Sequence, residues 1–100
     1  MQKNKIIFCE CIMNKYIIEF LGTLFLMFVI LYTGNWLAIG AALAIGALLG
    51  GPISGGSFNP AVTVALLAAG KINSGDVVPY IVAEISGALA AFELVKLVKK

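Results

Sequence analysis

Long apolar stretches, separated by short polar or glycine-rich runs, dominate the sequence. The three longest cover residues 16–33, 36–51 and 77–95. Glu19 interrupts the first stretch, and Glu84 and Glu93 lie in the third. A Gly34-Asn35 pair, which is a typical turn signal, separates the first two. A helix needs about 20 residues to cross a hydrocarbon core about 30 Å thick, so the pattern predicts three transmembrane helices.

The segment between the second and third stretches has a different pattern. Residues 50–60 are rich in glycine, proline and serine, and we expect no regular helix to persist through them. Residues 61–69 are apolar helix formers, with Gly70 as the expected C-cap. A helix over residues 60–69 would be about 15 Å long, which is half a bilayer. Irregular backbone at membrane depth is tolerated only inside protein or along a cavity, so we expect a re-entrant loop and a half-helix.

The composition agrees with an all-α membrane protein of three transmembrane helices plus one half-helix. Hydrophobic residues make up 61% of the chain and charged residues 12%, whereas a soluble domain carries about 25% charged residues. All seven basic residues are Lys and there is no His. The sequence therefore offers neither a basic stripe for nucleic acid nor an imidazole for metal binding or base catalysis. We expect no metal site, no cofactor and no enzymatic activity, and we interpret Cys9 and Cys11 as incidental thiols.

The half-helix begins with a residue pair that can hold a neutral polar solute. Asn59 is a good N-cap and Pro60 a good first helical residue. If the Asn59 carbonyl accepts from the Ala61 or Val62 N–H, its NH₂ group stays available to donate outward. The positive end of the helix dipole lies at the same point, where it favours water or alcohol oxygens and repels cations. Gly55 and Gly56 allow a turn that directs nearby carbonyls into the same cavity.

Three blocks of this sequence resemble the first half of the major intrinsic protein (aquaporin) family. Glu19-Phe20-Leu21-Gly22-Thr23 resembles the family's first span. Its first pore loop is matched by Ser54-Gly55-Gly56-Ser57-Phe58-Asn59-Pro60-Ala61-Val62-Thr63. Its third span is matched by Ala83-Glu84-Ile85-Ser86-Gly87-Ala88. The resemblance covers about residues 15–95. It implies half of an inverted repeat, in which two half-helices meet at the midplane. The domain prediction is a lead-in over residues 1–15, a membrane domain over residues 16–95 and a basic tail over residues 96–100.

The resemblance also implies roles for single residues. Asn59, Pro60 and Ala61 form the pore motif, with Gly55, Gly56, Ser57 and Phe58 as the loop that precedes them. Ile39 aligns with the second-span filter position, and the family's filter Arg has no counterpart in this half. Pro52 and Ser57 replace histidines that are common in this loop, and Glu84 replaces a usual Gln. Glu19 is expected to accept backbone N–H groups of the loop, and Glu84 to support it. A proton-relay or cation-binding role and simple exposure near a span end remain open for these carboxylates.

The predicted function is a passive channel for water or small neutral solutes such as glycerol, built in the bilayer from two or more copies. One alternative is a non-conducting remnant, or a chain that pairs with a complementary half. Another is a small proton-coupled multidrug exporter, which would need four full spans. The lysines are balanced between the two expected sides of the membrane, at Lys3, Lys5, Lys15 and Lys71 against Lys96, Lys99 and Lys100. The positive-inside rule then gives almost no preferred orientation, and an antiparallel dimer becomes a candidate assembly.

Overall fold

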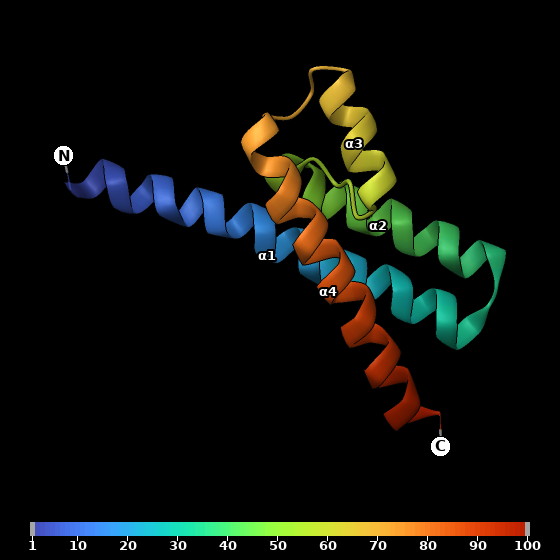
Figure 1. The fold of residues 1–100 in the computed structure, drawn as a ribbon. Helices are drawn as coiled ribbons and strands as arrows, with labels where there is room; N and C mark the ends of the chain where they lie inside the picture. The colour runs from blue at the N-terminus through green and yellow to red at the C-terminus, as the bar shows by residue number, and fades with distance from the viewer. Residues whose placement is uncertain (1, 100) are drawn as a thin grey trace.

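The computed structural model describes the backbone of residues 2–99 and the side chains of residues 13–99. Over this range the chain forms four helices and no strand. They are α1 (Gln2–Thr33), α2 (Trp36–Ser54), α3 (Pro60–Ala68) and α4 (Ser74–Val98) (Figure 1). The all-helical prediction is confirmed. The backbone of residues 2–15, expected as a lead-in, continues into α1 without a break, and the Cys9 and Cys11 side chains lie outside the described residues.

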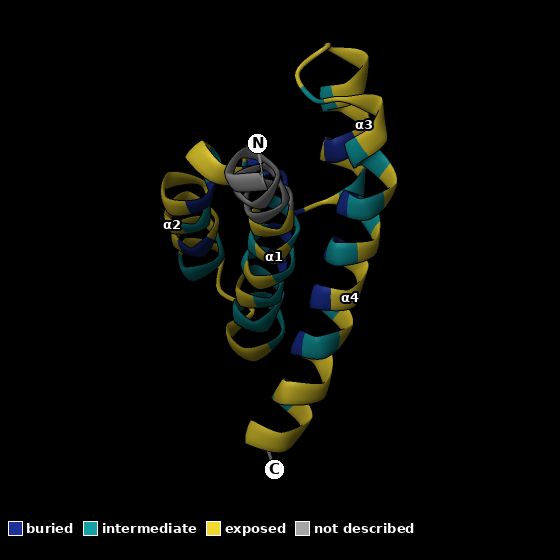
Figure 2. Cartoon of the chain, turned by 90° about the vertical axis from the view of Figure 1, so that its left-hand side faces the viewer, coloured by how far each residue is buried: buried dark blue, intermediate teal, exposed yellow. Residues whose placement is uncertain are grey.

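Helix α1 packs against α2 on one side and α4 on the other, and α3 packs against α4 (Figure 2). Asn35 in the short α1–α2 turn caps α2, so α2 returns antiparallel to α1. Helix α4 runs parallel to α1. Near the start of α4 the Lys15 Nζ of α1 lies 3.0 Å from Asp76 Oδ2, and at the C-terminal ends of both helices the Lys99 Nζ lies 5.6 Å from the centre of the Tyr32 ring.

Two helices in the described chain are long and apolar enough to cross a bilayer. They are Met13–Thr33 within α1 and Trp36–Ser54, which is α2. Helix α4 has 25 residues and carries more charge. Of its acidic residues, Glu93 lies exposed, 3.1 Å from Lys96, whereas Glu84 is fully buried.

The burial pattern is inverted relative to a soluble protein. The buried polar or charged residues are Glu19, Thr23, Ser54, Ser57, Thr63 and Glu84, whereas the buried apolar ones are Ala42, Phe58, Tyr80 and Ala91. Large apolar side chains lie on the outside along every helix, as Leu48, Leu49 and Leu89 do. A continuous apolar exterior around a polar interior is what a lipid environment requires.

The C-terminal end of α2 differs from the sequence prediction. We expected the helix to stop near Gly51, but it continues through Pro52 to Ser54. Proline removes only its own N–H from the helical ladder, and the loss falls in the last turn, where little helix remains to be disrupted. The helix ends where Gly55 adopts a left-handed φ of 92°, with its N–H bonded to the Gly51 carbonyl at 2.8 Å. The predicted end near Gly51 was three residues early, but no regular helix persists through residues 50–60, as expected.

Both ends of α3 match the sequence prediction within one residue. Asn59 is the N-cap and Pro60 the first helical residue. At the other end Gly70 has a φ of 73°, and the Lys71 N–H bonds the Leu66 carbonyl at 2.8 Å. This pairing is a Schellman motif with Gly70 at its left-handed position. The nine residues of α3 give a helix about 14 Å long.

Small residues allow close packing of α1 against α2 and α4. A Cβ built at Gly87 in α4 would overlap the Phe20 carbonyl oxygen of α1 and lie 3.2 Å from the Leu24 nitrogen. A Cβ at Gly50 in α2 would lie 2.8 Å from Ile18 Cγ2 of α1. Small residues therefore bring the backbones of these helices close together.

Candidate functional site

The loop between α2 and α3 has an unusual backbone. Gly55, Gly56 and Phe58 all have positive φ angles, of 92°, 66° and 55°. Glycine adopts such angles freely, but a left-handed residue with a bulky side chain costs of the order of 1–3 kcal/mol. Phe58 therefore needs strong surrounding contacts to hold its conformation.

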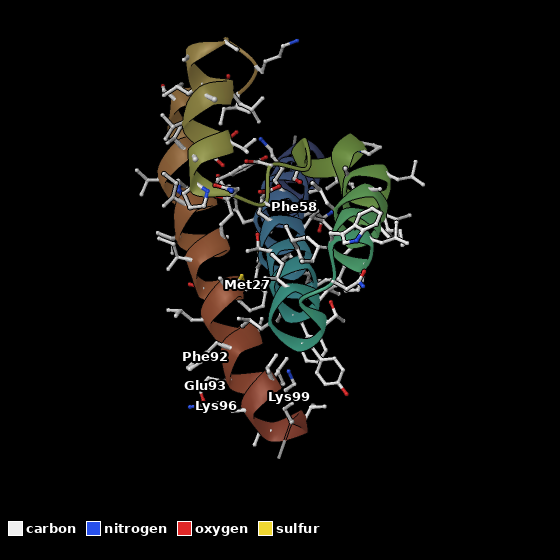
Figure 3. All side chains as sticks on the ribbon, turned by 90° about the vertical axis from the view of Figure 1, so that its right-hand side faces the viewer. Met27, Phe58, Phe92, Glu93, Lys96 and Lys99 are labelled. Atoms are coloured by element: carbon white, nitrogen blue, oxygen red, sulfur yellow. The ribbon has the colours of Figure 1, made fainter. Side chains whose placement is uncertain are left out.

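Those contacts come from a glycine-lined slot between α1 and α2. A Cβ built at Gly22 would overlap the Phe58 ring, and a Cβ at Gly46 or Gly50 would lie 3.1 Å from it. The ring is only 3% exposed. Figure 3 shows Phe58 between the helices, well away from the end of α4 that Lys96 and Lys99 mark. Van der Waals packing of the ring in this slot offsets the backbone cost.

The depth of this slot follows from the helices that form it. The centre of the span Met13–Thr33 is residue 23, and the centre of Trp36–Ser54 is residue 45. Gly22 and Gly46 are each one residue from those centres. Phe58, and Asn59 directly after it, therefore lie at the middle of both helices. The far end of α3 lies near the start of the span Met13–Thr33, because Gly70, Lys71 and Lys15 line one cavity of about 240 Å³.

Glu19 of α1 binds the loop at two points. Its Oε1 accepts the Phe58 N–H at 2.8 Å, and its Oε2 accepts the Ser54 hydroxyl at 2.6 Å. The carboxylate is fully buried. A backbone N–H at the centre of an apolar bundle needs an acceptor, and no regular ladder supplies one here. Glu19 is therefore the local substitute for that ladder.

A second buried carboxylate lies behind the half-helix. Glu84 of α4 accepts the Thr63 hydroxyl, with distances of 2.8 and 3.1 Å to its two oxygens. The Thr63 Oγ1 lies 2.6 Å from the Ser57 Oγ, which in turn donates to the Asn59 carbonyl at 3.2 Å. Glu84 is thus linked through two hydroxyl groups to the backbone at the start of α3. Both Glu19 and Glu84 are fully buried, which excludes the alternative that either carboxylate is simply exposed near the end of a span.

Tyr80 belongs to this cluster, and sequence reasoning missed it. Its hydroxyl donates to the Ser54 carbonyl at 2.6 Å, and its ring packs edge-on against Tyr16, 5.9 Å between centres. Tyr80 precedes Glu84 by four residues, so both side chains share one face of α4. That spacing beside an intramembrane acid was the signal available in the sequence.

Asn59 adopts the capping geometry that the sequence suggested. Its Oδ1 accepts the Ala61 N–H at 2.7 Å. The side chain is exposed, and within the described residues its NH₂ group has no hydrogen-bond partner. A cavity of about 220 Å³ between α1 and α4 reaches Asn59 and Pro60. Ile39, the expected filter residue, lies in the first turn of α2 and does not line this cavity.

Comparison with known proteins decides the family. The major intrinsic protein family model matches residues 9–100. The chain belongs to this family. The resemblance seen in the sequence is thereby confirmed. Members of the major intrinsic protein family are integral membrane channels rather than enzymes.

Individual relatives from this family match over a limited length. The chain is 45% identical over 93 residues to glycerol uptake facilitator protein-like 6 of Lactiplantibacillus plantarum, covering 84% of this chain and 43% of that protein. It is 36% identical over 101 residues to aquaporin Z of Bradyrhizobium diazoefficiens, covering 86% of this chain and 42% of that protein. For aquaporin Z of Brucella melitensis the identity is 39% over 94 residues, covering 79% of this chain and 41% of that protein. No solved structure matches the chain. The chain therefore spans less than half the length of these major intrinsic protein relatives.

Proposed function

We propose that this chain forms a passive transmembrane channel for water and small neutral solutes such as glycerol, built from two or more copies. One observation carries the proposal. At the middle of the spans Met13–Thr33 and Trp36–Ser54, Asn59 caps a half-length helix with its side-chain carbonyl oxygen, and its NH₂ group makes no hydrogen bond within the described residues. A neutral donor on the positive end of a helix dipole binds water and alcohol oxygens and disfavours cations.

The proposed membrane arrangement has α1, α2 and α4 as spans and α3 as a re-entrant half-helix. The 25 residues of α4 correspond to about 37 Å, enough to cross the hydrocarbon core with some tilt. Its parallel packing on α1 supports a third span. The short α3, which begins at mid-depth and ends level with Lys15, supports a segment that enters and leaves on one side.

The loop before Asn59 supplies the other half of the proposed solute path. The carbonyl groups of Gly55, Gly56, Ser57 and Phe58 accept no hydrogen bond from the described part of the chain. Such carbonyls can accept from a passing solute, which then meets the Asn59 donor. Acceptors followed by a donor form a polar track that a neutral hydroxylic molecule can follow without carrying charge.

One chain supplies only one such half-helix, so the proposed channel needs a second half. Two antiparallel copies would bring two Asn59 donors together near the midplane, and the balanced lysines are compatible with insertion in both directions. The short coverage of the relatives favours a second candidate, in which this chain pairs with a complementary half and does not conduct alone. The nine-residue α3 argues against a multidrug exporter, because it is too short for a fourth span.

Swelling of proteoliposomes that contain only this chain tests the proposal. Vesicles with the folded, oligomeric protein should show faster osmotic water or glycerol entry than empty vesicles, without an ion gradient. Permeability equal to that of empty vesicles would contradict a homo-oligomeric channel and favour the complementary-half candidate.

A further inference from the structure

A chain of three close contacts joins Glu84 of α4 to the backbone at the start of α3. The Thr63 Oγ1 lies 2.8 and 3.1 Å from the two Glu84 oxygens. It also lies 2.6 Å from the Ser57 Oγ, which is 3.2 Å from the Asn59 carbonyl oxygen. Glu84 and Thr63 are fully buried, and Ser57 is 4% exposed. These side chains must therefore satisfy their contacts with their own protons.

With Glu84 ionised, this chain of contacts is one proton short. The Asn59 carbonyl can only accept, so the contact with it uses the single hydroxyl proton of Ser57. The contact between Ser57 and Thr63 then uses the single hydroxyl proton of Thr63. No hydroxyl proton is left for the contact between Thr63 and Glu84. Two acceptors would face each other there at 2.8 Å.

A proton on Glu84 completes the chain of contacts. We propose that Glu84 is a neutral carboxylic acid whose hydroxyl donates to the Thr63 Oγ1. Thr63 then accepts from Glu84 instead of donating to it, and passes its own proton to Ser57. Ser57 donates to the Asn59 carbonyl. Each contact now has one donor and one acceptor, and the start of α3 is bonded to α4 through an unbroken series of hydrogen bonds.

The titratable groups around Glu84 favour its neutral form. Helix α4 packs against α1 and α3. Glu19 faces Glu84 from α1, and Tyr80 faces it from α4 itself. Residues 55–68, which make up the loop and α3, contain no titratable side chain. Glu19 accepts a backbone N–H on one oxygen and a hydroxyl on the other, so it can keep its charge. A second negative charge beside it would be strongly unfavourable.

The lysines whose side chains are described lie away from Glu84. They lie at Asp76 (Lys15), in the cavity at the far end of α3 (Lys71), at Glu93 (Lys96) and over the Tyr32 ring (Lys99). An ionised carboxylate that is buried without a cation is very costly, and such a group takes up a proton instead. The positions of the charges and the number of hydroxyl protons thus lead to the same protonation state.

The neutral state has a consequence for cation exclusion, and this consequence rests on the proposed function. Glu84 and Asn59 line the same cavity of about 220 Å³. The positive end of the α3 dipole amounts to about half an elementary charge. An ionised Glu84 would outweigh that charge and attract cations, whereas a neutral Glu84 leaves it in place. Glu84 is therefore a positioning residue whose proton also preserves the barrier to cations.

Infrared spectroscopy of the folded chain in lipid tests the protonation state. A carboxylic acid has a carbonyl stretching band that a carboxylate lacks. At neutral pH we expect this band in the unmodified chain, its loss in Glu84→Gln and its retention in the matched control Glu19→Gln. A missing band, or a band that Glu84→Gln leaves in place, would overturn the proposal and assign the Thr63 proton to an ionised Glu84.

Cation leakage from vesicles tests the consequence for the pore. Leakage through the unmodified chain should rise only over the pH range in which the infrared band disappears. Glu84→Gln keeps an N–H donor for Thr63 but cannot ionise, so its leakage should stay low over that range. Glu84→Met has no donor, and it should alter glycerol flux at neutral pH while Glu84→Gln retains the flux.

The outcomes separate the Glu84 proton from the channel proposal. Leakage that rises while the band is intact, or a band that disappears without a rise in leakage, would overturn the link to cation exclusion. Equal glycerol fluxes in the Gln and Met variants would overturn the positioning role. Impermeable vesicles in which the band is present and depends on Glu84 would overturn the channel and leave the neutral Glu84 standing.

Discussion

The aromatic ring of Phe58 occupies the space that a side chain at Gly22 would need. Gly46 and Gly50 border the same ring from α2. The pore loop is therefore attached to the α1–α2 pair by a side chain as well as by the hydrogen bonds of Glu19. This relationship makes an apparently ordinary glycine of α1 a determinant of the loop conformation.

Gly22→Ala should destabilise the protein through Phe58. Overpacking of this kind typically costs about 1–3 kcal/mol of the free energy of unfolding. Gly40→Ala in α2 is the matched control, because nothing lies within 4 Å of a Cβ built there. Unfolding in mixed micelles would measure both, and combining Gly22→Ala with Phe58→Leu should recover part of the loss. Equal effects of the two alanines would argue against the slot.

Glu19→Leu should cost more stability than Glu19→Gln. Leucine leaves the buried Phe58 N–H without an acceptor, which costs about 1–3 kcal/mol, while Ser54 can still donate to the Gly50 carbonyl at 3.3 Å. Glutamine keeps an acceptor for Phe58, and we expect a loss below about 1 kcal/mol. Free energies of unfolding would compare the two variants, and equal losses would show that the Phe58 bond contributes little.

Asn59→Asp should change what passes through the proposed channel. The substitution preserves the cap on Ala61 but replaces the NH₂ donors with a carboxylate. We expect the barrier to cations to fall and the flux of neutral solutes to change. Ion leakage and glycerol flux in vesicles provide the measurement. A correctly inserted variant with both unaltered would mean that Asn59 does not line a pore.

The solute range should be broad. With Ile39 at the aligned filter position and no Arg in the chain, a constriction there would be apolar and weakly discriminating. We expect glycerol and urea to pass along with water, and Ile39→Phe to slow glycerol more than water. A channel that passes water and rejects glycerol would show that other groups narrow the path.

Orientation in the membrane should be mixed. Single cysteines at either terminus, in a chain lacking Cys9 and Cys11, would report the side of each end by accessibility labelling. We expect both orientations in one population, because the flanking lysines are balanced. If every N-terminus lay on one side, the antiparallel pair would be excluded. Two additional lysines at one end should impose a single orientation and abolish permeability.

Local chemistry explains which parts of the fold could be predicted from the sequence. The Gly34-Asn35 turn, the Asn59 cap and the Gly70 terminus depend on residues within one or two turns, and all three occur where expected. The sequence did not predict that α2 extends through Pro52, because the neighbouring glycines suggested that the helix would end earlier. Proline is compatible with the last turn of this helix, and the predicted end was three residues early.

The interior of the candidate site was harder to predict because its contacts join distant parts of the chain. The sequence identified Glu19 and Glu84 as unusual, but not that Ser54, Thr63 and Tyr80 would bind around them. Those pairs are 21 to 35 residues apart. The left-handed backbone of Phe58 was also absent from the prediction, since nothing next to it in the sequence requires that conformation.

The glycine-lined slot also has a consequence for the order in which the molecule assembles. All three of its glycines lie in α1 and α2 and none in α3 or α4, so the slot needs only the α1–α2 hairpin to be packed. The loop then meets a finished receptor and adopts a shape that it would not hold alone. The hairpin thus serves as the template against which the left-handed backbone of Phe58 forms.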